Sequence, residues 1–230
     1  MILKGTREEM EQKAVEIISS SIKEILTKKD HVVFGIPGGR SVSGIFQKLL
    51  DADIDWNKVH IFMVDERLVA IEDKESNYKL AHFSFIGKLI TQGKITASHL
   101  HPFIYQPSEK DLGIKEYEKE LSSLGGTYDL LLLSSGEDCH IGALYPDHSV
   151  HDESPFFLTM EDSPKPPPKR MTISRKLLLK SRCAILLFFG EGKREAFEMF
   201  GSTDDHVRCP AKLIEKIPRN YVLTDIDARV

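Results

Sequence analysis

The chain has 230 residues, of which 41% are hydrophobic, 29% charged and 8% aromatic. These proportions are those of an ordinary globular protein, and they exclude a disordered or fibrous chain. A chain of this length can bury a sizeable core without metal or disulfide support, and length alone fits one domain or two small ones.

Charge is nearly balanced, with 31 Lys and Arg against 35 Asp and Glu and a formal net charge of -4. The absence of a long block of one sign argues against nucleic acid as a partner, whereas a small anionic substrate fits if a few cations converge on it. The N-terminal segment lacks the apolar stretch of a secretory signal, and the apolar run 184–189 is too short to cross a bilayer. The sequence therefore predicts a cytoplasmic protein without a membrane partner.

The first predicted element is a helix over residues 6–28, because Thr6 and Glu9 have capping-box spacing and apolar residues follow at helical intervals. Short, continuously apolar runs predict buried strands at 31–36, 59–64, 128–133, 183–189 and 221–224. Helical periodicity predicts helices at 43–50, 77–90, 109–124, 193–200 and 211–217, the last opened by Pro210. This alternation predicts an α/β fold: a Rossmann-like, mostly parallel sheet with helices on both faces.

Ligands bind such sheets at the carboxyl ends of the strands, so the segments that follow the strands are the candidates for a site. Four of them are unusual: 37–41, 65–67, 135–140 and 190–193. A fifth unusual segment, 163–170, combines prolines with cations and predicts either a linker or a binding loop.

The segment 37–41 lies between a strand and a helix, where Gly38 and Gly39 would let the backbone approach an anion. It matches neither nucleotide-binding glycine motif, so a phosphate cradle and a plain turn both remain open. The triplet Asp65-Glu66-Arg67 also has two interpretations: a solvated loop, or charges that serve a site at the mouth of a buried strand.

His140 follows a predicted strand and stands beside a glycine and two carboxylates, which suits a general base oriented by an acid. A structural histidine and a nucleophilic Cys139 are the alternatives. The three cysteines, Cys139, Cys183 and Cys209, have no C-x-x-C spacing, which predicts reduced thiols and no cysteine zinc site. His99 with His101, and the group 147–152, match no metal-ligand spacing and are interpreted as surface histidines, so no metal is predicted.

Together these segments resemble the 6-phosphogluconolactonase family, within the group that includes the glucosamine-6-phosphate deaminases. The resemblance extends over nearly the whole chain and implies a single domain over residues 1–230. It is carried by Gly38-Gly39, 54–56, 64–67, 76–78, 136–146, 163–167, and Gly190 with Lys193.

The resemblance implies hydrolysis of 6-phospho-D-glucono-1,5-lactone to 6-phospho-D-gluconate, the second step of the pentose phosphate pathway, without metal or organic cofactor. His140 would act as general base and acid, Arg67 would stabilise the oxyanion, and Asp65 or Asp138 would orient their neighbours. Phosphate binding would fall to the following residues: Gly38, Gly39, Arg40, Ser41, Lys165, Arg170 and Lys193.

Two residues depart from the family pattern. Cys139 stands where glycine is common, and Arg40 stands where a small hydroxyl residue is usual. A deaminase would carry an acid five residues after the histidine and an aromatic residue after the acidic pair. Tyr145 and Arg67 occupy these positions here, which favours the lactonase. A catalytically silent sugar-phosphate sensor is the third reading.

Overall fold

Seven strands form a central sheet whose neighbouring strands all run parallel, in the order β1-β10-β9-β6-β2-β3-β5. The computed structural model describes residues 1–226, without the side chain of Arg40. The strands are β1 (Ile2–Lys4), β2 (Val32–Ile36), β3 (Val59–Met63), β5 (Leu100–His101), β6 (Leu130–Ser134), β9 (Cys183–Phe188) and β10 (Arg219–Thr224). The predicted α/β class is confirmed, although β1 and β5 were not expected from the sequence.

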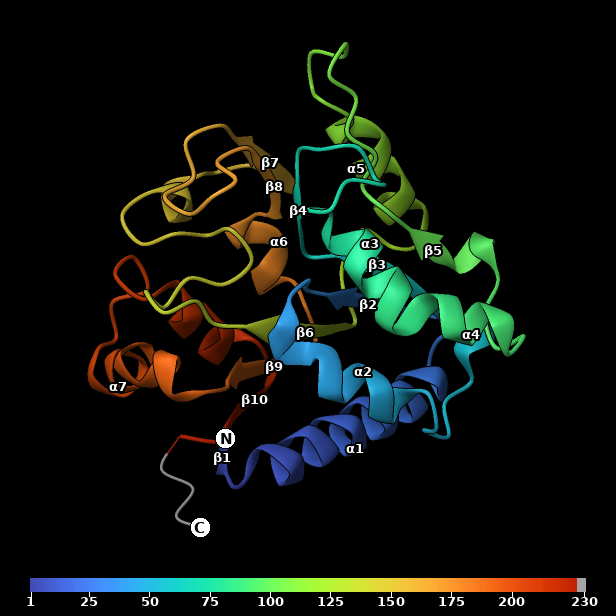
Figure 1. Cartoon of the computed structure of the whole chain (residues 1–230), viewed down its shortest axis with the longest axis horizontal. Coiled ribbons are helices and arrows are strands. Elements are labelled where there is room, and N and C mark those ends of the chain that lie inside the picture. The colour runs from blue at the N-terminus through green and yellow to red at the C-terminus, as the bar shows by residue number, and fades with distance from the viewer. Residues whose placement is uncertain (227–230) are drawn as a thin grey trace.

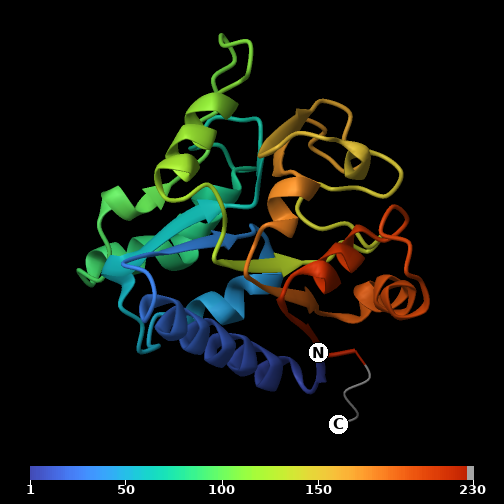
Figure 2. The same ribbon diagram turned by 180° about the vertical axis from the view of Figure 1, so that it is seen from behind.

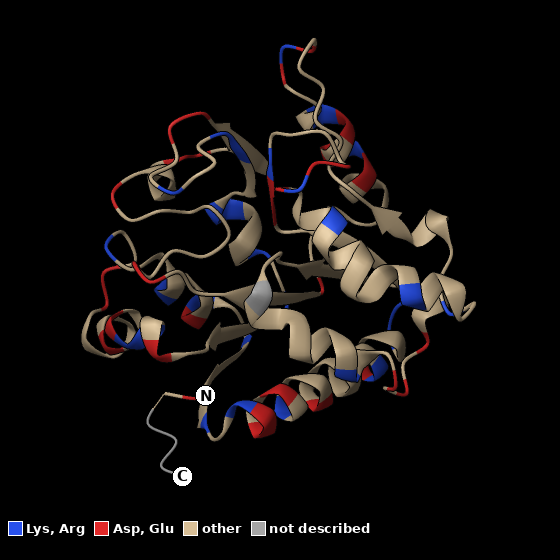
Figure 3. Cartoon of the chain, viewed as in Figure 1, with Lys and Arg blue, Asp and Glu red and all other residues tan. Residues whose placement is uncertain are grey.

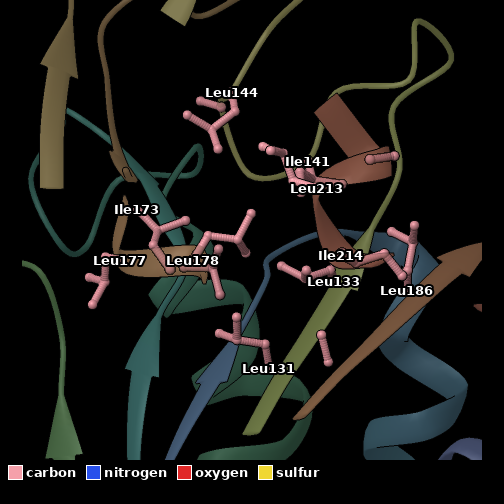
Figure 4. Packing of buried hydrophobic residues seen from close by; sticks show 14 of the residues in the cluster. Leu131, Leu133, Ile141, Leu144, Ile173, Leu177, Leu178, Leu186, Leu213 and Ile214 are labelled. Carbon is pink, nitrogen blue, oxygen red and sulfur yellow. The ribbon is translucent and has the colours of Figure 1, made fainter. Parts of the chain in front are cut away.

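Alternate residues of each central strand belong to different hydrophobic clusters, which explains why these strands are apolar throughout. Leu130 and Leu132 of β6 pack with α1 (Arg7–Leu26), α2 (Ser43–Leu49) and α4 (Gly87–Thr91). Leu131 and Leu133 pack on the other face with α5 (Ile114–Ser123), α6 (Arg175–Leu179) and α7 (Arg194–Ser202). Figure 4 shows part of this second cluster, and Figures 1 and 2 show the helices on both faces of the sheet.

A second, antiparallel sheet joins β4 (Asp65–Arg67), β8 (Arg170–Ile173) and β7 (Phe157–Met160) in the order β4-β8-β7. The triplet that was expected to be a loop is therefore a strand, because its backbone pairs with β8. The proline-rich segment 163–170 connects β7 to β8 within this sheet, so the prediction of a linker is wrong.

Three predicted helices differ from the structure. The helix expected over 77–90 consists of α3 (Asn77–Ala81), a π-helical turn (His82–Ile86) and α4. The helix expected from 109 begins only at Ile114, because Leu112 and Gly113 have positive φ angles of 57° and 98°. The segment Pro210–Lys216 is a 3-10 helix.

The first helix has the predicted start. The Thr6 side chain accepts a hydrogen bond from Glu9 N, and the Glu9 carboxylate accepts one from Thr6 N, which completes the capping box. Charges of both signs are interspersed along α1, as Figure 3 shows. Within residues 1–226, no helix has the length and apolar character needed to cross a membrane.

The cysteine prediction is wrong for two of the three residues, because Cys139 and Cys209 form a disulfide with a Cα–Cα distance of 5.0 Å. These residues are 70 positions apart in the chain, and Ala211 N donates a hydrogen bond of 3.0 Å to Cys139 O. The contact therefore depends on how the 3-10 helix packs against the 136–140 loop, which spacing alone does not reveal. Cys183 is free and buried.

Candidate active site

The site lies where the strand order reverses. From β2 the chain proceeds outward to β3 and β5, whereas β6, β9 and β10 lie on the other side of β2. The crevice beyond the carboxyl ends of β2 and β6 is therefore the topological switch point of the sheet. A cavity of about 510 Å³ occupies this place. It is lined by Pro37, Gly38, Gly39, Ser41, Asp65, Arg67, Asn77, Ser134, Ser135, Gly136, Glu137, His140, Gly142, Tyr145, Lys165, Arg170 and Lys193.

The loop after β2 brings bare backbone to the cavity. A Cβ on Gly38 would lie 2.0 Å from Asn77 Oδ1, and Gly39 has a φ of 103°, so both positions favour glycine. The Ser41 hydroxyl donates to Ser134 Oγ at 2.9 Å, which ties this loop to the end of β6. Arg40 begins the adjoining 3-10 helix, Arg40–Val42, and its side chain is not among those that the structure describes.

His140 is held by its own loop. Its Nδ1 lies 2.5 Å from Asp138 Oδ1, and its side chain is 18% exposed. Partial burial acts to raise the pKa of Asp138, but the hydrogen bond and charge of His140 outweigh it and lower that pKa to about 2. Asp138 is therefore a carboxylate at neutral pH, and it leaves Nε2 of the imidazole free for proton transfer.

Gly136 makes room for this histidine, because a Cβ there would lie 2.0 Å from His140 Nδ1. Cys139, between Asp138 and His140, has a φ of 69°, so this position does require the left-handed backbone that favours glycine. The Cys139 side chain is fully buried and bonded to Cys209. It therefore points away from the cavity, and the nucleophilic-cysteine reading is wrong.

The acidic pair after β3 divides into two functions. Buried Glu66 accepts hydrogen bonds from the backbone N–H groups of Arg67, Asn77 and Tyr78 at 2.7 to 2.8 Å. Two of these N–H groups belong to the first turn of α3, so the carboxylate stabilises the start of that helix. Burial raises the pKa of Glu66, although these hydrogen bonds oppose the rise. Asp65 lines the cavity and accepts from Asn77 Nδ2 at 3.2 Å. The solvated-loop reading of this triplet is therefore wrong.

Arg67 reaches the cavity with part of its guanidinium engaged. Its Nη1 donates to Glu75 O at 2.6 Å, whereas its buried Nε has no hydrogen-bond partner among the described residues. The contact with Glu75 fixes the orientation of the guanidinium, and Arg67 borders the cavity, so its positive charge can serve a ligand.

Three further cations from two loops border the same cavity. Arg170 is buried, donates to Pro166 O and Pro167 O, and places Nη1 3.9 Å from Asp65 Oδ2, so it also holds the β7–β8 connection. Lys165 and Lys193 are half-buried. Burial lowers the pKa of Lys193, and the nearby Lys165 lowers it further, while Glu137 and Asp138 oppose this. Two lysines that border one cavity attract an anion into it.

The histidines set aside as surface residues are not all at the surface. His101 Nε2 lies 2.9 Å from His60 Nδ1, and its Nδ1 lies 2.8 Å from Glu120, with only 13% of the side chain exposed. Burial, together with the neighbouring histidines, lowers the pKa of His60 to about 4. Within residues 1–226 no group of three or more His, Cys, Asp or Glu side chains is arranged to hold a metal ion.

The cavity thus brings together the predicted site residues, except that Asp138 lies behind His140 and the side chain of Arg40 is not described. Sequence reasoning missed Asn77, which packs on Gly38 and binds Asp65. It also treated Tyr145 only as a mark against a deaminase, although this residue lines the cavity. The signal for both was their place in segments that already carried the family resemblance.

Comparison with known proteins gives a consistent result. The family model "Glucosamine-6-phosphate isomerases/6-phosphogluconolactonase" matches residues 5–223. A 6-phosphogluconolactonase of Borreliella burgdorferi is 33% identical over 201 residues, which cover 86% of each chain.

Solved structures agree in fold. A 6-phosphogluconolactonase from Thermotoga maritima has a TM-score of 0.84 at 22% identity, covering 98% of this chain and 99% of the other. A monomeric glucosamine-6-phosphate deaminase has a TM-score of 0.83 at 22% identity, covering 99% and 98%. The fold alone therefore does not distinguish the two activities.

Proposed function

Because the chain belongs to the glucosamine-6-phosphate isomerase/6-phosphogluconolactonase family, we propose that it hydrolyses 6-phospho-D-glucono-1,5-lactone to 6-phospho-D-gluconate. This is the second step of the oxidative pentose phosphate pathway. The observation that carries the proposal is the Asp138–His140 pair, 2.5 Å apart, at one side of a cavity bordered by Arg67, Lys165 and Lys193. A base and several cations are what hydrolysis of a phosphorylated lactone requires.

In the proposed reaction, His140 Nε2 removes a proton from water as the water oxygen attacks the lactone carbonyl. The carbonyl oxygen becomes negative, and the positive charge of the Arg67 guanidinium, which borders the cavity, stabilises it. The C–O bond to the ring oxygen then breaks, and the imidazolium returns the proton to that oxygen. Asp138 keeps the ring oriented and stabilises its charged form throughout.

The phosphate is proposed to lie between the loop after β2 and the two lysines. Gly38, Gly39 and Ser41 border the cavity, and no atom of the described residues lies within 4 Å of an added Cβ on Gly39, so the backbone there can approach an anion. Lys165 and Lys193 supply charge-assisted hydrogen bonds from the opposite side. Arg170 contributes charge, although its Nε and Nη2 already donate to carbonyl groups. Arg40 stays a predicted phosphate ligand.

The alternative activity is that of a deaminase, whose fold is equally similar. Its chemistry moves a proton at carbon 2 of an aminosugar and needs a further carboxylate. The position that would supply this acid is Tyr145, which is buried beside His140. This substitution favours the lactonase.

The test is an assay of purified protein with freshly generated 6-phosphogluconolactone, measured against spontaneous hydrolysis of the lactone. We expect rapid opening of the lactone and no ammonia release from glucosamine 6-phosphate. Comparable ammonia release would make the protein a deaminase. Binding of 6-phosphogluconate without turnover would make it a sugar-phosphate sensor. The cytoplasmic location stays a prediction from the sequence.

A further inference from the structure

The hydroxyl group of Tyr145 is a buried polar atom that stands out within the part of the chain that the structure describes. The residue is 0% exposed, and among the described residues no group makes a hydrogen bond with its oxygen. The Ser163 hydroxyl is close enough to lower the Tyr145 pKa, but the two groups do not meet in hydrogen-bond geometry, and Ser163 donates to Lys165 O at 3.0 Å. Leaving a buried hydroxyl unpaired is unfavourable, because the group loses its hydrogen bonds to water without gaining others. Phenylalanine would fill the same space without that cost.

A backbone hydrogen bond and a ring contact fix the position of Tyr145. Its backbone N–H donates to Ser149 Oγ at 2.8 Å, and Ser149 in turn donates to Ala143 O. Its ring centroid lies 4.6 Å from that of His140 at an interplanar angle of 46°. The side chain therefore has little freedom to find another partner.

The unpaired hydroxyl borders the reaction site. Tyr145 lines the same cavity as His140 and Arg67. Burial raises the pKa of Tyr145, and Asp65 and Asp138 raise it further, while Ser163 and Arg170 oppose the rise. The group is thus an O–H donor at neutral pH, on a ring that packs against the His140 imidazole.

We propose that the Tyr145 hydroxyl donates a hydrogen bond to the carbonyl oxygen of the lactone and acts with Arg67 as a second oxyanion donor. This inference rests on the proposed function. The hydrogen bond of a neutral donor strengthens as the oxygen becomes negative, so its contribution falls mainly on the chemical step. It also gives a reason for tyrosine, rather than an acid or an apolar residue, five positions after the base.

The test compares Tyr145→Phe with wild type in lactone hydrolysis. The substitution keeps the ring against His140 and removes one oxygen. Loss of one oxyanion donor while Arg67 remains should lower kcat roughly 10- to 100-fold, with KM and the affinity for 6-phosphogluconate changed less than twofold. The matched control is Tyr128→Phe, which also removes a buried and unpartnered hydroxyl, from a core tyrosine that does not line the cavity. It should leave kcat unchanged.

Each outcome has one meaning. Unchanged kcat in Tyr145→Phe, or a loss confined to KM, would overturn the inference and leave the lactonase intact. An equal loss in Tyr128→Phe would show that core packing causes the effect, and would also overturn the inference. A wild-type protein without lactone turnover would overturn both proposals together.

Discussion

Among single residues, the geometry of the site depends on two glycines. Gly136 and Gly38 each lie so close to a functional side chain that a methyl group would overlap it. In both cases the atoms in the way belong to a side chain, His140 or Asn77, rather than to backbone. A methyl group would therefore displace the functional group more than it would disturb the fold.

The first prediction concerns Gly136→Ala. The new Cβ would lie 2.0 Å from His140 Nδ1 and 2.6 Å from Asp138 Oδ1, so the imidazole must move away from its carboxylate. We expect kcat to fall about 100-fold while the melting temperature changes little. Gly201→Ala is the control, because nothing lies within 4 Å of its added Cβ, and it should keep full activity. Full activity in Gly136→Ala would contradict the assigned geometry.

The second prediction concerns His140→Ala. Because the base acts in the chemical step and other loops hold the phosphate, lactone hydrolysis should fall by roughly 10²- to 10⁴-fold. The affinity for 6-phosphogluconate, measured by titration calorimetry, should stay within a few-fold of wild type. Near-normal turnover would remove His140 from its proposed role.

At the scale of elements, the cavity is assembled by segments that leave the carboxyl ends of different strands. The loop after β2 supplies backbone, the loop after β6 supplies the base, and the segment after β9 supplies Lys193. The antiparallel sheet adds a second layer of contributors, with Arg67 on β4, Arg170 on β8 and Lys165 between β7 and β8. Charge recognition and proton transfer are therefore carried by different elements and can be altered separately.

The third prediction tests this division with Lys165→Ala and Lys193→Ala. Each removes a cation that contributes only when the ligand carries a phosphate. We expect kcat/KM for 6-phosphogluconolactone to fall roughly 10-fold or more, with little change for unphosphorylated gluconolactone. Lys110→Ala, at an exposed position outside the cavity, serves as the control. Equal losses for both substrates would assign the two lysines a structural role.

At the scale of the whole molecule, one edge of the central sheet carries a cluster of histidines. His60 on β3 lies against His101 on β5, with the rings of His31 and His99 5.6 Å and 5.1 Å from that of His60. Glu120 is the carboxylate of this group and binds His101. The hydrogen bond between His60 and His101 joins β3 to β5 at the edge of the sheet.

The fourth prediction is that this edge makes stability depend on pH. The pKa of His60 is lowered in the folded state from 6.5 to about 4, so between these values the unfolded chain binds more protons, and stability falls as pH decreases. After screening by solvent, the loss amounts to about 1–2 kcal/mol, or roughly 2–8 °C in melting temperature. His60→Gln should show a smaller decrease than wild type between pH 7 and pH 4.5. Identical pH profiles would contradict this account.

The sequence by itself determined the parallel sheet, because five continuously apolar runs alternate with amphipathic segments and only burial on both faces explains such strands. It also located the site, since loops with glycine, His140 and cations follow those strands. These signals are local, so they can be read from neighbouring residues.

Only the tertiary structure decided the rest, because it depends on contacts between distant parts of the chain. Strand β4 forms because Asp65 pairs with Thr172, and three residues carry no periodicity that could predict it. The disulfide joins cysteines 70 positions apart. Packing in three dimensions also places Asn77 against Gly38 and leaves the Tyr145 hydroxyl without a hydrogen-bond partner among residues 1–226. The sequence identified the residues that border the site, and packing decided which of their polar atoms are left for a ligand.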